Sequence, residues 1–419
     1  MGANCVTSAS IGCLFCFKGC QPNHLINLLT FIPPKSSYKV ERSEEDPSKG
    51  KIVYQMSELR RSSLYKQALE ASEVRWVKTR LGNTIPVVWV HNKPPQNERS
   101  KQEKAVEEAR SSRGVGVLWQ GSRSNNSDQK KEAPPPEKES SKLPPIVLLH
   151  CHGNATDIGI MMGPYYELAM TLGIQVVGVE YSGYGASSGR PSTMNTMADV
   201  EAAYDMVVSA GISPSRIIAY GQSIGSGPVS SLAAKKPIGG AILHSPLLSG
   251  IKVIDPQPDR CCRPSTMYQC FDFYPNDRRL QCVTCPVFVI HGKSDEIIPF
   301  YHGSRLSKVC PEPQRWPPYF PEQAGHNDIV ESDHRAYFGE VSNFIHGVHR
   351  RSLGLPAMPT AKVQMPQPPE AASGSPSDSA SGESAGQSAF NAVEREPAAG
   401  PEDGRYELLR KGVCGPAVR

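Results

Sequence analysis

The 419-residue sequence lacks several features that would assign it to a common functional class. It has no run of about 18 apolar residues, as a membrane-spanning helix requires, and no apolar segment typical of a secretory signal peptide. Its longest apolar stretch near the start, residues 25–32, is too short to cross a bilayer. A net charge of +4 is too small to indicate a nucleic-acid partner, and we expect none.

The 12 cysteines lack the regular spacing of a disulfide framework. Four of them crowd the first twenty positions, and the others are scattered. Together with the missing secretory segment, this distribution predicts reduced thiols and a protein on the cytosolic side of membranes. A chain of this length has room for one large α/β domain with appendages.

Residues 1–33 form a leader in which four cysteines stand among scattered apolar side chains. Clustered cysteines of this kind are acceptors for S-acylation, and a cluster is useful because a single acyl chain binds a bilayer only reversibly. We therefore predict an acylated leader that holds the protein on the plasma membrane or an endomembrane. The predicted lipidation sites are Cys5, Cys13, Cys16 and Cys20.

Two other modifications of the leader are less well supported. Gly2 could be myristoylated, but that motif favours Ser or Thr at position six and this chain has Val6. Cys13 and Cys16 could form half of a zinc site, but no second His or Cys pair follows at finger spacing. We therefore predict no metal in the leader.

The next two segments differ sharply in composition. Residues 34–93 contain an amphipathic helical stretch, 59–69, and two β-favouring runs, 74–79 and 85–90, which predict an antiparallel pair at a sheet edge. Residues 94–143 are dominated by Lys, Glu, Ser, Gln and Asn and cannot form a core. This second segment predicts a disordered polar insertion within the domain.

In residues 144–350, near-continuous apolar strand patterns alternate with helix patterns, as in a parallel sheet covered on both faces. Residues 245–285 form a long excursion between two strands, and we expect a small cap there; its cysteines are more typical of packed or loop thiols than of a zinc site. Residues 351–419, rich in Pro, Ala, Ser, Gly and Glu, predict a disordered tail. The expected strands are 146–150, 176–179, 217–220, 241–244, 287–290 and, more weakly, 318–320, and the expected helices are 161–172, 197–208, 223–234 and 332–349.

The pentapeptide Gly-x-Ser-x-Gly occurs three times, and its surroundings distinguish the three serines. Ser223 follows the apolar run 217–220 and precedes a small-residue, helix-compatible stretch, which together match the strand, sharp turn and helix of a nucleophile elbow. Ser187 leads into Arg190-Pro191, which favours a loop. Ser384 lies in the polar tail with no strand before it. Ser223 is therefore the predicted nucleophile.

An α/β-hydrolase places its nucleophile, acid and base in that order along the chain. Asp295 follows the apolar strand 287–290, and His326 lies in a Gly-flanked loop before the last helix. We predict that His326 takes the proton of Ser223, while Asp295 orients the imidazole and stabilises the imidazolium. The alternatives are Glu296 or Asp328 as the acid, and His291, His302 or His334 as the base.

Two backbone N–H groups should stabilise the oxyanion of the tetrahedral intermediate. One belongs to Ile224, directly after the nucleophile, and we assign the other to Asn154 in the loop after strand 146–150. His152 precedes a glycine in that loop, so we expect a structural role for it rather than metal binding. No cofactor and no metal is expected at this site.

Six motifs lie along residues 144–350. They are His152-Gly-Asn154, Tyr181-Ser-Gly-Tyr-Gly-Ala-Ser-Ser-Gly-Arg-Pro191, Tyr220-Gly-Gln-Ser-Ile-Gly225, His244-Ser-Pro-Leu247, His291-Gly through Asp295, and Gly325-His-Asn-Asp-Ile329. Together they resemble one family, the alpha/beta hydrolase domain-containing protein 17 family of membrane-bound serine hydrolases that remove S-acyl groups from proteins. The resemblance covers about residues 1–40 and 144–350, whereas the insertion, the tail and the cysteine-rich cap depart from the family pattern.

The resemblance implies an α/β-hydrolase fold, with a mostly parallel central sheet, and a protein depalmitoylase. In such an enzyme Ser223 attacks a palmitoyl-cysteine thioester, and S-acylated membrane proteins are the substrates. A lipid or small-ester hydrolase would use the same triad. A catalytically idle, membrane-tethered scaffold is a third alternative, although the intact order of Ser, Asp and His argues against it. We expect a monomer.

Overall fold

The computed structural model describes residues 27, 30–92, 146–254 and 272–355. The four predicted lipidation sites, the polar insertion, the middle of the predicted cap, nearly all of the tail and Ser384 lie outside these residues. Within the described part of the chain, no helix combines the length and the apolar character needed to span a membrane.

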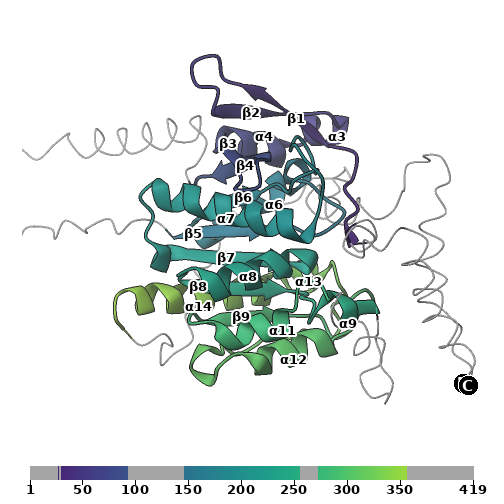
Figure 1. The fold of residues 1–419 in the computed structure, drawn as a ribbon, viewed down its shortest axis with the longest axis vertical. Coiled ribbons are helices and arrows are strands. Elements are labelled where there is room, and N and C mark those ends of the chain that lie inside the picture. The colour runs from purple at the N-terminus through teal and green to yellow at the C-terminus, as the bar shows by residue number, and fades with distance from the viewer. Residues whose placement is uncertain (1–26, 28–29, 93–145, 255–271, 356–419) are drawn as a thin grey trace, which may run out of the picture. The chain divides into compact units, whose positions relative to one another are not determined.

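A mixed sheet of nine strands runs through the described residues in the order β1-β2-β3-β4-β6-β5-β7-β8-β9 (Figure 1). Neighbours from β6 to β9 are parallel, and β1 to β4 form an antiparallel extension that joins β6 through β4. The strands are β1 (Tyr38–Arg42), β2 (Lys49–Tyr54), β3 (Ser72–Lys78), β4 (Thr84–Val90), β5 (Val147–Cys151), β6 (Gln175–Val179), β7 (Ile217–Gln222), β8 (Gly240–His244) and β9 (Val287–Ile290).

The antiparallel pair β3–β4 is present as predicted, but its expected position at the sheet edge is wrong. Strands β1 and β2 lie outside it, and β4 pairs with β6 on its other side. The sequence of β2 does alternate between exposed and buried positions, as a strand with one solvated face should. Two exposed lysines and a glycine at its second position make β2 hard to recognise as a strand from the sequence.

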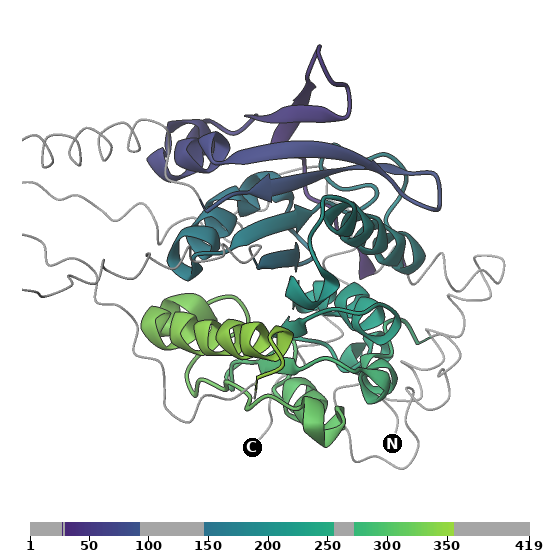
Figure 2. The same ribbon diagram turned by 90° about the vertical axis from the view of Figure 1, so that its left-hand side faces the viewer.

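Helices cover both faces of the sheet (Figure 2). Helices α6 and α14 lie on one face, and α7 and α8 lie on the other. The helices are α3 (Ser57–Arg61), α4 (Ser63–Glu70), α6 (Ile158–Leu172), α7 (Thr193–Ser209), α8 (Ser226–Lys235), α9 (Gly250–Ile254), α11 (Asn276–Arg279), α12 (Tyr301–Val309), α13 (Ile329–Ser332) and α14 (His334–Ser352), with short 3-10 turns η1 (Pro214–Arg216), η2 (Ser223–Gly225), η4 (Leu280–Cys282) and η5 (Glu312–Gln314). This arrangement is the α/β-hydrolase fold.

Capping residues explain why two helices begin earlier than their apolar patterns suggest. The Asp157 side chain accepts the N–H of Ile160, so α6 begins three residues before the predicted start. Ser192 caps α7 in the same way. The expected helix over 59–69 is divided into α3 and α4, because Ser62 between them has an extended backbone.

The segments after β8 and β9 combine loops with short helices. The described ends of the predicted cap meet where the N–H of Gly250 donates to the carbonyl of Phe273, at 2.7 Å. Cys285 is buried and Cys282 is exposed. Near residues 318–320, two single bridges beside β9 replace the expected weak strand.

Candidate active site

Ser223 stands at a sharp turn between β7 and α8. Its φ of 52° lies in the left-handed region, which is strained for a residue with a side chain. Glycines two residues before and two after make the turn feasible: a Cβ on Gly221 would collide with the Gly225 carbonyl, and one on Gly225 with the Cys151 carbonyl. The predicted elbow therefore has the geometry that exposes a serine Oγ at the end of a sheet.

His326 bridges the predicted nucleophile and the predicted acid. Its Nε2 lies 3.0 Å from Ser223 Oγ, and its Nδ1 lies 2.7 Å from Asp295 Oδ2. Asp295 follows β9 and His326 precedes α13, so each side chain comes from a loop at the same end of the parallel strands. Because Nδ1 faces a carboxylate, it carries the proton, and Nε2 is left to accept the hydroxyl proton of Ser223.

The Asp295 carboxylate is held by four donors. Its Oδ1 accepts the N–H groups of Ile297 and Ile298, at 2.9 and 2.7 Å, and its Oδ2 lies 3.1 Å from His291 Nε2 as well as beside His326. Burial alone would raise the pKa of Asp295, but the hydrogen bonds from His291 and His326 outweigh burial and hold that pKa well below its usual range. The carboxylate is therefore charged at neutral pH.

The two alternative acids hold the backbone of the histidine loop and do not contact the His326 ring. Glu296 Oε2 accepts the backbone N–H of His326 at 3.3 Å, and Asp328 Oδ1 accepts that of Gly325 at 2.6 Å. Both carboxylates thus fix the path of the loop that carries the base. Asp295 is the carboxylate that contacts the ring.

The three alternative bases have other partners. His291 Nε2 also lies 2.9 Å from the Ile298 carbonyl, so it carries a proton and donates to Asp295 rather than serving Ser223. His302 Nδ1 accepts the N–H of Leu248 at 2.9 Å. His334 is exposed and contacts a glutamate of α6. The contact of His291 with the acid is a functional detail that sequence reasoning missed, since it treated His291 only as a competing base.

A second strained serine supports the base. Ser245 directly follows β8, is fully buried, and has a φ of 45°. Its Oγ lies 3.3 Å from the carbonyl of His326, to which it donates. Next to it, burial and the nearby His326 and His291 lower the pKa of His244 to about 3, so that ring stays neutral. Ser245 therefore holds the backbone of His326, and His244 places no charge beside the triad.

The loop that carries the predicted second oxyanion donor packs against the elbow. The carbonyls of Cys151 and His152 lie directly over the Cα of Gly225, one residue beyond the predicted donor Ile224. The Asn154 side chain is fully engaged: its Oδ1 accepts from the Ile32 N–H at 3.0 Å and from a tyrosine hydroxyl, and its Nδ2 donates to a backbone carbonyl. The Asn154 side chain thus fixes the loop while its backbone N–H is the predicted donor.

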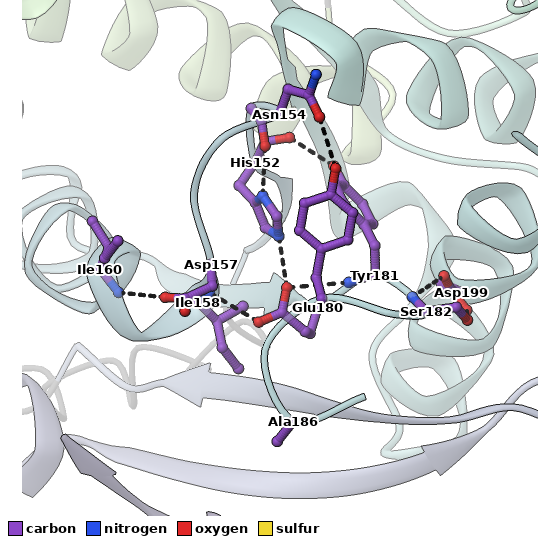
Figure 3. Close-up of polar contacts among 12 residues, drawn as sticks. His152, Asn154, Asp157, Ile158, Ile160, Glu180, Tyr181, Ser182, Ala186 and Asp199 are labelled. Carbon is purple, nitrogen blue, oxygen red and sulfur yellow. Dashed lines mark hydrogen bonds and ion pairs between the residues drawn. The ribbon is translucent and has the colours of Figure 1, made fainter. Parts of the chain in front are cut away.

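His152 lies at the base of this loop and is completely buried (Figure 3). Its Nε2 is 3.0 Å from Glu180 Oε1, and its Nδ1 is 2.8 Å from the carbonyl of Gly153. Both ring nitrogens of His152 therefore face protein oxygens, and neither is available to a ligand in this arrangement. Within the described ranges, no group of three or more His, Cys, Asp and Glu side chains is placed to hold a metal ion. Ser187, the other described serine of the repeated motif, lies in the loop between β6 and α7.

Comparison with known proteins finds relatives that align with much of the chain. No protein-family model matches the chain. Human alpha/beta hydrolase domain-containing protein 17B is 32% identical over 327 residues, which cover 78% of this chain and 92% of that protein. Mouse alpha/beta hydrolase domain-containing protein 17C is 43% identical over 183 residues, covering 43% of this chain and 54% of that protein. Among solved structures, a Pyrococcus furiosus esterase aligns at 12% identity with a TM-score of 0.46, over 75% of this chain and 98% of that one.

Proposed function

We propose that this chain, which belongs to the alpha/beta hydrolase domain-containing protein 17 family, is a serine hydrolase that removes fatty acyl groups from the cysteine thioesters of membrane-associated proteins. The observation that carries the proposal is the single imidazole of His326, which lies within hydrogen-bond reach of both Ser223 Oγ and Asp295 Oδ2. This is the arrangement of a nucleophile, a general base and its orienting acid.

Acylation of the enzyme is the first half of the proposed reaction. Ser223 Oγ attacks the thioester carbonyl carbon while His326 Nε2 takes the hydroxyl proton. The N–H groups of Ile224 and Asn154 stabilise the resulting oxyanion. The carbon–sulfur bond then breaks, and the imidazolium returns the proton to the leaving thiolate, which departs as a free cysteine.

Deacylation completes the cycle. Water attacks the ester carbonyl on Ser223, and His326 takes a proton from that water. The second tetrahedral intermediate collapses to a free fatty acid, and Ser223 Oγ regains its proton from the imidazolium. The charged carboxylate of Asp295 stabilises the imidazolium in both halves, because its hydrogen bonds keep it ionised.

The choice of an S-acylated protein as substrate is supported by family membership and by the cysteine-rich leader. An acylated leader would tether the chain to the cytosolic face of the plasma membrane or an endomembrane. There it would meet acylated proteins at a high effective concentration. No cofactor enters the proposed reaction.

Paired substrates test the proposal. The purified protein should release the acyl group from a palmitoyl-cysteine peptide faster than from a glyceride of the same chain length. Ser223→Ala should abolish that release. If a fluorophosphonate labels the protein rapidly but the protein hydrolyses the glyceride faster than the thioester, it is a lipid esterase. A wild-type protein that neither labels nor hydrolyses either substrate would support the scaffold alternative.

A further inference from the structure

The end of the predicted acylated leader and the residues directly after it are hydrogen-bonded to the oxyanion loop. We call residues 30–38 the strap. Its first contact is with Asn154, whose Oδ1 accepts the N–H of Ile32 at 3.0 Å and whose Nδ2 donates to the carbonyl of Thr30 at 2.7 Å. Tyr184 completes the set by donating its hydroxyl to the same Oδ1 at 2.7 Å. The half-buried amide of Asn154 therefore has three protein partners, two of them on the strap backbone.

A second contact lies at the end of the oxyanion loop. Asp157 caps α6 by accepting the N–H of Ile160 (Figure 3). It also accepts both the N–H and the hydroxyl of Ser37, at 2.7 and 2.5 Å. Asp157 and Ser37 are both buried. The strap is thus fixed to the middle and to the C-terminal end of the segment between β5 and α6.

A third contact uses a buried carboxylate beneath the loop. Glu180 Oε2 accepts the N–H of Ile158 at 3.2 Å, while its Oε1 faces His152 (Figure 3). The same Oε2 also accepts the hydroxyl of Tyr38 at 2.8 Å. Tyr38 reaches this position because Gly185 has no side chain: a Cβ there would meet both the Tyr38 hydroxyl and the Glu180 carboxylate. One carboxylate therefore links the strap, the base of the oxyanion loop and the start of α6.

Apolar packing also holds the strap against the domain. The Phe31 side chain is 5% exposed, belongs to the main core and meets Tyr274 edge to face at 6.5 Å. Just before the strap, Asn27 Oδ1 accepts the N–H of Thr193 at the start of α7. The strap is therefore part of the folded domain, and it connects the leader directly to the loop beside the elbow.

We propose that residues 30–32 of the strap act through the Asn154 side chain to position the Asn154 backbone N–H as an oxyanion donor. Asn154 is then a positioning residue as well as a donor, because its side chain and its N–H share one Cα. This inference rests on the proposed function. An oxyanion donor acts on the transition state, so its displacement lowers kcat and leaves KM nearly unchanged.

Two variants remove the contact from opposite sides. Asn154→Ala keeps the backbone N–H and removes the amide, and Ile32→Pro keeps the amide and removes one of its donors. Each should lower kcat for a small soluble ester by about 10-fold, a fraction of the loss expected when an oxyanion donor is deleted outright. Asn154→Asp retains the acceptor for Ile32 and Tyr184 and should recover part of the kcat lost in Asn154→Ala.

The matched control replaces Cys5, Cys13, Cys16 and Cys20 with Ser in the full chain, which leaves the strap contacts intact. That variant should keep the wild-type kcat on the soluble ester. Each variant's Tm is measured alongside. If Ile32→Pro does not fold, Tyr184→Phe, which removes the third partner of Asn154 Oδ1, takes its place with an expected smaller loss in kcat.

The outcomes separate this inference from the proposed function. If wild type is inactive, or if Ser223→Ala is as active as wild type, the proposed function fails. If wild type acts through Ser223 and folded Asn154→Ala and strap variants match its kcat, the strap inference fails. A raised KM with unchanged kcat also overturns it, because that result assigns the strap to substrate binding.

Discussion

At the scale of single residues, two histidines contact the same carboxylate, that of Asp295. Asp295 Oδ2 faces His326 at 2.7 Å and His291 at 3.1 Å, and the backbone donors on Oδ1 leave the carboxylate no freedom to rotate. The sequence identified Asp295, His326 and Ser223 as a set because their order and flanking strands are local features. It did not identify the contact of His291 with the acid or the support from Ser245, because these depend on how separate loops meet in space.

His291→Ala tests the second histidine. Removing its hydrogen bond should raise the pKa of Asp295 toward its usual range, because that bond is one of the contacts that lower it. We expect kcat at neutral pH to fall by about 10-fold, the cost of one hydrogen bond to a charged group. The acidic limb of the kcat profile should also move to higher pH. His334→Ala, which changes an exposed histidine, is the control. An unchanged pH profile in His291→Ala would show that His291 does not support the acid.

At the scale of secondary-structure elements, the loop after β5 packs against the elbow between β7 and α8. The turn from β7 to α8 packs so closely on the loop after β5 that Gly225 leaves no space for a Cβ below the Cys151 carbonyl. Sequence patterns located β5 to β9 to within one or two residues because each is a short apolar run. They missed β1 and β2, whose solvated side chains match neither an apolar run nor a helix, and they misplaced helix starts where a polar cap begins the helix.

Gly225→Ala and Gly339→Ala form a matched pair of substitutions. At Gly225 the new methyl group must displace backbone, so we expect a loss of about 1–3 kcal/mol in the free energy of unfolding. Activity should fall sharply in the same variant, because the oxyanion loop moves. At Gly339 in α14 a Cβ meets nothing within 4 Å, and we expect a gain of about 0.5–1 kcal/mol. Denaturant unfolding measures the change in stability of each variant, and ester turnover measures its activity. Equal effects at the two sites would show that close backbone packing at Gly225 does not matter.

At the scale of the whole molecule, the described residues join the end of the leader, the oxyanion loop and the triad in one domain. The alternation of apolar strand patterns with helix patterns predicted the fold class, since apolar strands must be covered on both faces. It could not predict that the strap reaches the catalytic loop. Those contacts join residues more than a hundred positions apart, such as Ile32 with Asn154 and Tyr38 with Glu180.

A buried carboxylate should make the stability of the domain depend on pH. Burial raises the pKa of Asp199 to about 7, although the N–H and hydroxyl of Ser182 bond to it and oppose the rise. The folded state therefore binds this proton more tightly than the unfolded state. The resulting stabilisation is complete below the unfolded pKa and is lost as pH rises to about 7.

Asp199→Asn measures that contribution. Between pH 4.5 and 7.5, about the window between the unfolded and folded pKa values, the Tm of wild type should decline more steeply than that of the variant. Asp205→Asn on the same helix is the control, because its exposed side chain pairs with Lys236 at the surface. Parallel Tm curves for wild type and Asp199→Asn would contradict the assignment.

The predicted acylation of the leader can be tested by where the protein is found in the cell. Replacing its four cysteines with Ser should move the full-length protein from the membrane fraction to the cytosol, because no acyl chains remain to hold it. Fractionation of cells that express either form measures the change. A variant that stays on membranes would show that something other than these thiols anchors the chain.

The central claim is a covalent acyl-enzyme on Ser223. The protein is mixed with a palmitoyl-thioester peptide, quenched in acid within the first turnovers, and analysed by intact mass and peptide mapping. We expect one added palmitoyl group on the wild-type peptide that contains residues 221–225, and none on the same peptide of Ser223→Ala. Acyl transfer to a cysteine, or turnover with no adduct on Ser223 in any sample, would contradict it.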